Sequence, residues 1–273
     1  MPMQLPPRLA ALSERFSQFG FERTRRALAA LALSAFVTLY FLVSLNPDLP
    51  EGLGRVFLAL SVCYAVGFLG VVAEWFWGRW FATGLAWSGV MMAIAVMAML
   101  GWVTQLAVFG GLHLLVAVTL MGNKMAARYD LQEAWRARYK IDEYGVARLR
   151  KAVTSAAASL PSMIMWALGP KDGDQALVTA GGLAVLVLAV LGLRGLVRLR
   201  SWGVVALGGA AALAVTGALF FAPICTHPDL LYHAPGHMLE TSVIAAPQLA
   251  VVFLMAAVIP FVRPVARFLR RSA

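Results

Sequence analysis

The chain has 273 residues, of which 61% are hydrophobic and 13% are charged, and its mean hydropathy is +0.78. This composition is too apolar for an ordinary soluble domain, so lipid must solvate much of the surface. In such a protein the net charge of +10 indicates membrane orientation rather than binding to nucleic acid. The two cysteines, Cys63 and Cys225, form no CxxC or CxxCH motif, and the sequence carries neither a haem motif nor a nucleotide-binding motif.

The N-terminal residues 1–26 are polar and basic and lack a cleavable signal, so we expect the first apolar run to be retained as a helix. Leu9, Leu12, Phe16 and Phe19 recur at helical spacing. This spacing is typical of an amphipathic helix in the membrane interface, and a disordered tail is the alternative.

Eight apolar stretches approach the length of about 20 residues that a membrane helix needs. They are 27–45, 53–75, 80–100, 102–121, 154–168, 176–193, 202–221 and 242–262. The sequence therefore predicts an all-α polytopic membrane protein, with eight transmembrane helices in a domain spanning 27–262. Trp75, Trp77 and Trp80 indicate an interfacial aromatic belt between the second and third spans. The fifth span is short and contains Pro161, which makes it the least typical.

The largest polar segment is the loop 123–153, which contains eight Lys or Arg residues. Leu131, Trp135 and Tyr139 repeat every four residues within it. This repeat predicts an amphipathic helix lying on the membrane surface.

Eight spans place both termini on the same side of the membrane, together with 21 of the 23 Lys and Arg residues. Only Arg55 and Lys171 fall on the other side. Because cytoplasmic loops are enriched in Lys and Arg, we expect cytoplasmic termini in a bacterial-type inner membrane. The loop 222–241 is then exoplasmic, and the basic tail 263–273 is cytoplasmic. Two four-helix halves joined by the basic loop are compatible with this order.

Ionisable residues inside a membrane are functional candidates because their desolvation is unfavourable. No predicted span has Lys or Asp at its centre, which argues against a retinal protein and against a proton-driven carrier with an acidic relay. Glu74 lies near the inner end of the second span, where we expect it to reach the interface or to pair with Arg79.

His113 is the one deep histidine, and it is either a hydrogen-bonded core side chain or a ligand. Binding of haem b would normally require paired histidines on facing helices, so a single deep histidine argues against a cytochrome b.

The third span also contains several methionines, Met91, Met92, Met97 and Met99. Their thioethers are soft ligands that suit copper, so they are candidates for a metal path. Packing or lipid contact is the alternative explanation.

The segment from Phe221 to Thr241 holds three of the four histidines of the protein. Cys225, His227, His233 and His237 follow the spacing C-x-H-x5-H-x3-H. Thiolate and imidazole are the ligands that zinc and copper prefer, so this segment is the best candidate for a metal site, with a solvated loop as the alternative. If the last helix starts early, Glu240 lies on the same face as His237.

Two family resemblances begin at these residues. The run His233-Ala-Pro-Gly-His237 resembles the HxxxH that opens the last helix in the alkaline ceramidase and adiponectin-receptor superfamily of membrane zinc hydrolases. That resemblance implies zinc ligands at His233 and His237, although the early-helix histidine of the pattern is missing here and Pro235-Gly236 interrupts the pair. The sequence His237-Met-Leu, followed by Ala246-Pro247-Gln-Leu, is similar to a pattern in cytochrome oxidase copper-assembly factors over about a dozen residues.

Three functions follow as hypotheses. The leading one is an exoplasmic zinc or copper site used in metal handling or in the assembly or support of a membrane redox complex. The second is an integral-membrane zinc hydrolase acting on lipids, in which Glu240 is the general base. The third is a structural subunit that uses small residues such as Gly181-Gly182 and Gly208-Gly209 to pack against other membrane subunits. Membrane lipids are expected partners in every case.

Overall fold

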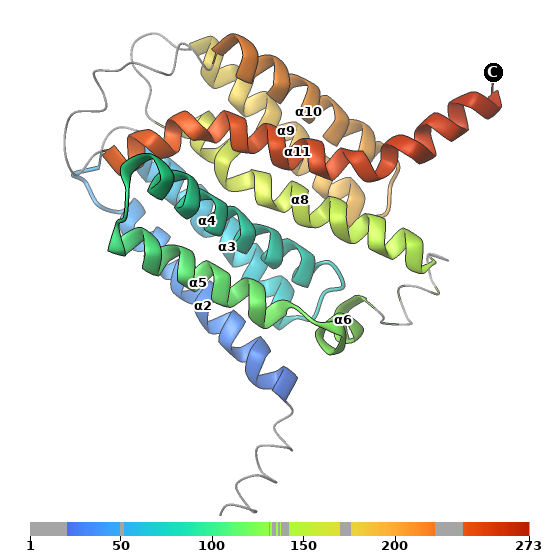
Figure 1. The fold of residues 1–273 in the computed structure, drawn as a ribbon, viewed down its shortest axis with the longest axis horizontal. Coiled ribbons are helices and arrows are strands. Elements are labelled where there is room, and N and C mark those ends of the chain that lie inside the picture. The colour runs from blue at the N-terminus through green and yellow to red at the C-terminus, as the bar shows by residue number, and fades with distance from the viewer. Residues whose placement is uncertain are drawn as a thin grey trace, which may run out of the picture.

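The structure is a computed structural model that describes residues 21–49, 52–130, 132, 135, 137, 142–169, 176–221 and 237–272. These residues contain nine helices and no strand, which confirms the predicted all-α fold (Figure 1). The helices are α2 (Phe21–Ser44), α3 (Leu53–Val72), α4 (Gly78–Leu100), α5 (Thr104–Leu120), α6 (Asn123–Asp130), α8 (Glu143–Leu168), α9 (Ala176–Val197), α10 (Trp202–Phe221) and α11 (His237–Ser272).

Each of the eight predicted spans coincides with one of these helices, and the chain is a polytopic membrane protein. Six helices are long and apolar enough to cross a membrane: α2, α3, α4, α9, α10 and part of α11. A seventh crossing results if α5 and α6, which are bent by 73° at the break between them, count as one span. Helix α8 does not belong to this group, since Ser, Thr and charged residues interrupt its apolar sequence.

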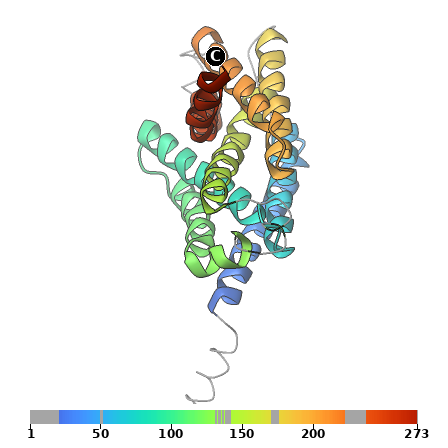
Figure 2. The same cartoon turned by 90° about the vertical axis from the view of Figure 1, so that its right-hand side faces the viewer.

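The helices form two groups of four. In the first group α2 packs on α3, α3 on α4 and α4 on α5, and α5 returns to α2. In the second group α8, α9, α10 and α11 close a ring in the same way. The two groups meet mainly where α4 packs on α8, and Figure 2 shows α8, in yellow-green, between them. Helix α8 is therefore solvated by protein rather than by lipid.

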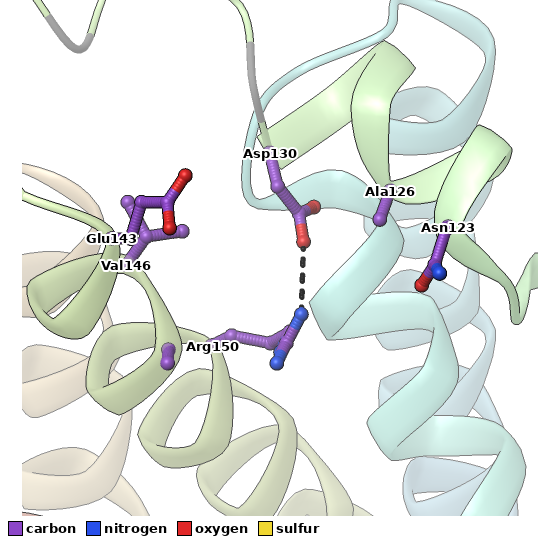
Figure 3. Close-up of a pocket in the computed structure, with 7 residues that line it drawn as sticks. Asn123, Ala126, Asp130, Glu143, Val146 and Arg150 are labelled. Atoms are coloured by element: carbon purple, nitrogen blue, oxygen red, sulfur yellow. Dashed lines mark hydrogen bonds and ion pairs between the residues drawn. The ribbon is translucent and has the colours of Figure 1, made fainter.

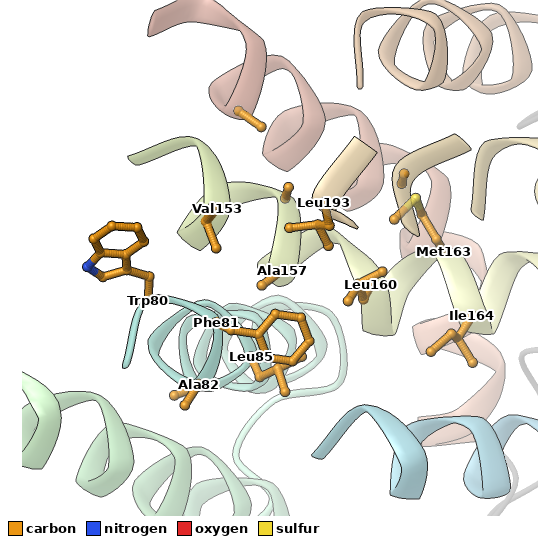
Figure 4. Packing of buried hydrophobic residues seen from close by; sticks show 14 of the residues in the cluster. Trp80, Phe81, Ala82, Leu85, Val153, Ala157, Leu160, Met163, Ile164 and Leu193 are labelled. Atoms are coloured by element: carbon orange, nitrogen blue, oxygen red, sulfur yellow. The ribbon is translucent and has the colours of Figure 1, made fainter. Parts of the chain in front are cut away.

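Close packing of α4 against α8 depends on small residues. Ala152, Ala156, Ala157 and Ala158 of α8 are buried, and Figure 4 shows Ala157 next to α4. A Cβ atom added at Gly84 of α4 would lie 2.2 Å from the carbonyl oxygen of Thr154. Since lipid is as apolar as these side chains, helix association in a membrane relies on such close packing rather than on the hydrophobic effect.

Large apolar side chains on the outside of the bundle face the surroundings. Trp102 is 79% exposed and Val205 is 75% exposed, for example. The tryptophans of the predicted belt divide between two environments. Trp75 is exposed as expected, but Trp80 is buried in the core, so it does not contribute to an aromatic belt facing lipid.

Several helix boundaries differ from the predicted ones. The predicted fifth span, 154–168, is the second part of a continuous helix that begins at Glu143, where Asp142 Oδ1 accepts a hydrogen bond from Gly145 N at 2.7 Å. The last helix begins at His237 and continues to Ser272, so the predicted tail from residue 263 extends the same helix. Of the predicted N-terminal segment, 21–26 form the first turns of α2, and residues 1–20 lie outside the described residues.

One end of the bundle gathers polar contacts from four segments, and we call it the basic end. The start of α2, the α3–α4 turn, the α5–α6 turn and the start of α8 meet there. Arg25 Nη2 donates to Val118 O at 2.8 Å, Arg128 Nε donates to Glu74 at 2.9 Å, and Arg150 approaches Asp130. Helix α10 ends and α11 begins at the opposite end, which we call the far end (Figure 1).

Candidate functional site

The ligand-rich segment at the far end lies mostly outside the described residues. Cys225, His227 and His233 belong to 222–236, which the structure does not describe. His237 is the first residue of α11, and Glu240 follows it by one helical turn. The backbone therefore places these two residues on one helical face, as expected for an early start of the last helix.

The described residues contain no group of three or more His, Cys, Asp or Glu side chains that could hold a metal ion. This finding covers the deep His113 and the acidic residues of the basic end. The four ligands predicted for the far end are consequently untested by the structure, and the described part of the chain offers no competing metal centre.

His113 is a fully buried core residue with both ring nitrogens occupied. Its Nδ1 lies 2.8 Å from the carbonyl oxygen of Phe109, and its Nε2 lies 2.6 Å from the hydroxyl of Tyr64. A carbonyl can only accept, so Nδ1 carries the proton and Nε2 of the neutral ring accepts from the Tyr64 hydroxyl. A metal could reach Nε2 only if Tyr64 moved away. The geometry favours the interpretation of His113 as a hydrogen-bonded core side chain.

Aromatic rings and a glycine enclose the His113 ring. The ring centroid lies 4.0 Å from that of Phe36 and 4.3 Å from that of Phe109. A Cβ atom added at Gly89 would come within 2.1 Å of His113 Cδ2. Helices α2, α3, α4 and α5 therefore all contribute to one packed polar centre within the first group.

The methionines proposed as a soft metal path, Met91, Met92, Met97 and Met99, all belong to α4. Met91 is 40% exposed, and Met92 is half-buried. This exposure matches the alternative explanation, in which Met91 contacts lipid and Met92 takes part in packing.

Glu74 lies in the α3–α4 turn, at a positive φ of 53°. It pairs with Arg26 of α2 and with Arg128 of α6. Of the two alternatives expected for Glu74, the pairing with Arg79 is therefore wrong, since Arg79 pairs with Asp130. Because the turn reverses the chain between Glu74 and Arg79, the two side chains have different partners although they are close in sequence. Glu74 is 31% exposed in its side chain, and its contacts connect α2 and α6 to the turn.

Arg79 pairs instead with Asp130, a residue that the sequence reasoning did not identify. Asp130 Oδ1 accepts from Arg79 Nε at 3.2 Å and from Trp80 Nε1 at 2.8 Å, and Oδ2 accepts from Arg79 Nη2. Arg79 Nη1 also donates to the carbonyl oxygen of Leu120 at 3.1 Å. The side chains are only 9% and 3% exposed, so this is a buried, hydrogen-bonded ion pair.

Helix α6 holds Asp130 in place by packing its apolar side under the α3–α4 turn. Met125 and Tyr129, spaced by four residues, are fully buried, and the Tyr129 hydroxyl donates to Val71 O at 2.8 Å. Burial raises the pKa of Tyr129, against the opposing effect of neighbouring guanidinium groups, so the hydroxyl remains a donor. The spacing of Met125 and Tyr129 is the sequence signal that could have predicted a buried helix here.

A pocket of about 230 Å³ opens between α6 and the start of α8 (Figure 3). It is lined by Asn123, Ala126, Asp130, Glu143, Val146, Ala147 and Arg150. Trp135, which follows α6 and belongs to the predicted surface helix, is buried. Its ring stacks on that of Phe76, with ring centroids 4.4 Å apart. Leu131 and Tyr139 of the same prediction lie outside the described residues.

Comparison with known proteins gives no relative for this chain: no family model, no curated protein and no solved structure matches it. The function must therefore be inferred from the residues themselves.

Proposed function

We propose that this membrane protein binds a zinc or copper ion through Cys225, His227, His233 and His237, and that it serves in metal handling or in the support of a membrane redox complex. The observation that carries the proposal is the concentration of thiol and imidazole ligands in one short segment of a chain with four histidines. The fourth histidine, His113, is committed to Tyr64 and Phe109.

The position of the segment also supports the proposal. It joins α10 to α11 at the end of the bundle opposite the Arg79–Asp130 pair. By the same topology, 21 of the 23 Lys and Arg residues, which would repel a cation, are predicted on the other side of the membrane, with Arg55 and Lys171 as the exceptions. The prediction that this end is exoplasmic in a bacterial-type inner membrane, based on the distribution of Lys and Arg, belongs to the same proposal.

Metal analysis of the purified full chain tests the proposal. We expect zinc or copper to be retained by the wild-type protein and lost in a variant with His227, His233 and His237 all changed to Ala. A Met91→Leu, Met92→Leu double variant is the matched control, and it should retain the metal. Equal, near-zero metal in the wild type and in the triple variant would contradict the proposal and leave the structural-subunit hypothesis.

A zinc hydrolase acting on lipids is a second candidate, and the start of α11 favours it. His237 and Glu240 are one turn apart on this helix, an arrangement that can hold a metal with one residue and place the other as a general base for metal-bound water. Hydrolysis of lipid amides or esters that requires zinc and is lost in Glu240→Gln would support this candidate. Bound copper without hydrolysis would favour metal handling.

A further inference from the structure

The pocket at the basic end is built from one face of each of two helices. On α6 the lining residues recur at i, i+3 and i+7, and on α8 they recur at i, i+3, i+4 and i+7: Asn123, Ala126 and Asp130 on the first, Glu143, Val146, Ala147 and Arg150 on the second. Arg150 and Asp130 face each other across it, with Glu143 beside Val146 on α8 and Asn123 on the opposite side on α6 (Figure 3). Its location, where the helices end, corresponds to the headgroup region of a membrane.

Arg150 is available to a ligand in this pocket. Its Nη1 lies 3.4 Å from Asp130 Oδ2, a long contact, and its side chain is 46% exposed. Asp130 is already neutralised by Arg79 and accepts a further hydrogen bond from Trp80. Among the described residues Asp130 is the one recorded partner of Arg150, and Asp130 already pairs with Arg79, so the Arg150 charge is only partly compensated there. Its guanidinium group is planar and suited to phosphate.

Glu143 supplies the opposite charge at the other end of the same face. It is exposed in the first turn of α8, two turns before Arg150. The pocket thus presents a guanidinium group and a carboxylate along one face of α8. Across from them on α6 lie the Asn123 amide and the Asp130 carboxylate, which already pairs with Arg79. A ligand that fits both charges carries an anionic and a cationic group of its own.

We propose that this pocket binds the headgroup of an ethanolamine phospholipid. Arg150 donates hydrogen bonds to the phosphodiester, and Glu143 accepts hydrogen bonds from the primary ammonium. A choline headgroup has no N–H to donate, and a purely anionic headgroup meets repulsion from Glu143. The volume of about 230 Å³ is below that of pockets for drug-sized ligands, which suits a headgroup whose acyl chains remain in the membrane.

Thermal unfolding of the purified full chain in detergent, with defined lipids added, tests this proposal. We expect dioleoyl phosphatidylethanolamine to raise Tm by about 5 °C more than dioleoyl phosphatidylcholine or dioleoyl phosphatidylglycerol does. Free phosphoethanolamine at the same concentration should have little effect. Equal shifts from the ethanolamine and choline lipids, a larger shift from the glycerol lipid, or an equal shift from free phosphoethanolamine would each overturn the proposal.

Variants locate the effect in the pocket. Glu143→Gln and Arg150→Gln should each abolish the difference between the ethanolamine and choline lipids. Arg148→Gln is the matched control, because Arg148 is two residues away and stacks on the exposed Tyr144 ring at 4.8 Å from its centroid, outside the pocket. If Arg150→Gln fails to fold, Glu143→Gln decides, since its exposed side chain contributes little to folding. A lipid preference that survives in Glu143→Gln would contradict the proposal.

Discussion

Arg79 and Asp130 lie 51 residues apart in the sequence and form a buried ion pair that connects the start of α4 to the end of α6. The carboxylate also accepts from Trp80 Nε1, and the guanidinium group also donates to Leu120 O, so most of their hydrogen-bonding capacity is satisfied. Removal of one partner would leave the other charged and buried, which is far less favourable than the loss of an exposed pair.

Asp130→Asn should therefore lower the free energy of unfolding by about 3–5 kcal/mol. Glu74→Gln is the comparison, because Glu74 is 31% exposed and its pairs with Arg26 and Arg128 are partly screened by solvent. Its effect should be about 1 kcal/mol or less. Thermal or denaturant unfolding of the purified variants in one detergent measures the difference. Equal effects of the two substitutions would show that the Arg79–Asp130 pair is not buried in the protein.

Gly84→Ala should weaken the packing between the two four-helix groups, because Gly84 lies where α4 contacts α8. The added Cβ would meet the backbone oxygen of Thr154 at 2.2 Å, and backbone atoms of two packed helices have little room to move. We expect a loss of about 1–3 kcal/mol. Gly208→Ala in α10 is the control, since nothing lies within 4 Å of its added Cβ, and it should be neutral or stabilising by up to about 1 kcal/mol. A neutral Gly84→Ala would contradict the close contact of α4 and α8.

Tyr64→Phe should destabilise the first helical group because it removes the hydroxyl that donates to His113 Nε2. An unsatisfied buried acceptor lowers stability by about 1–3 kcal/mol. Tyr144→Phe, at a side chain that is 72% exposed, provides the matched control. The two variants are compared by their unfolding midpoints. A loss of stability no larger than that of the control would argue that Nε2 has another partner.

Orientation in the membrane can be measured with introduced cysteines in a Cys63→Ala, Cys225→Ser background. A cysteine replacing Asp229 should react with a membrane-impermeant maleimide added outside intact cells. A cysteine replacing Lys124, which is 88% exposed at the basic end, should react only after permeabilisation. The reverse pattern would show that the basic end faces outward, against the expectation from Lys and Arg distribution.

The eight helical stretches could be predicted from sequence because apolar length is a local property. The burial of α8 could not, since its neighbours α4, α9 and α11 are brought to it only by the fold. A helix surrounded by protein tolerates Ser, Thr and Pro161, whereas the sequence, with apolar length as its signal, predicts only a short span after a basic loop. Its true start is at Glu143 because Asp142 caps it there.

The ion pairs show a similar limit. Proximity in sequence suggested that Glu74 pairs with Arg79, but the turn at Glu74 sends these two side chains to different partners. Asp130 lies within a mainly polar segment, where no sequence pattern distinguishes a buried carboxylate from a solvated one. Long-range pairing of this kind depends on tertiary structure.

Metal binding by the segment between α10 and α11 is tested most directly by a chelator-competition titration. The metal-free full chain would be titrated with Zn²⁺, and separately with Cu⁺, against a chromophoric chelator of known affinity. We predict that the wild type withdraws one equivalent of one of these ions from the chelator and that the variant with His227, His233 and His237 changed to Ala withdraws none. Identical titration curves for the two proteins would contradict the claim.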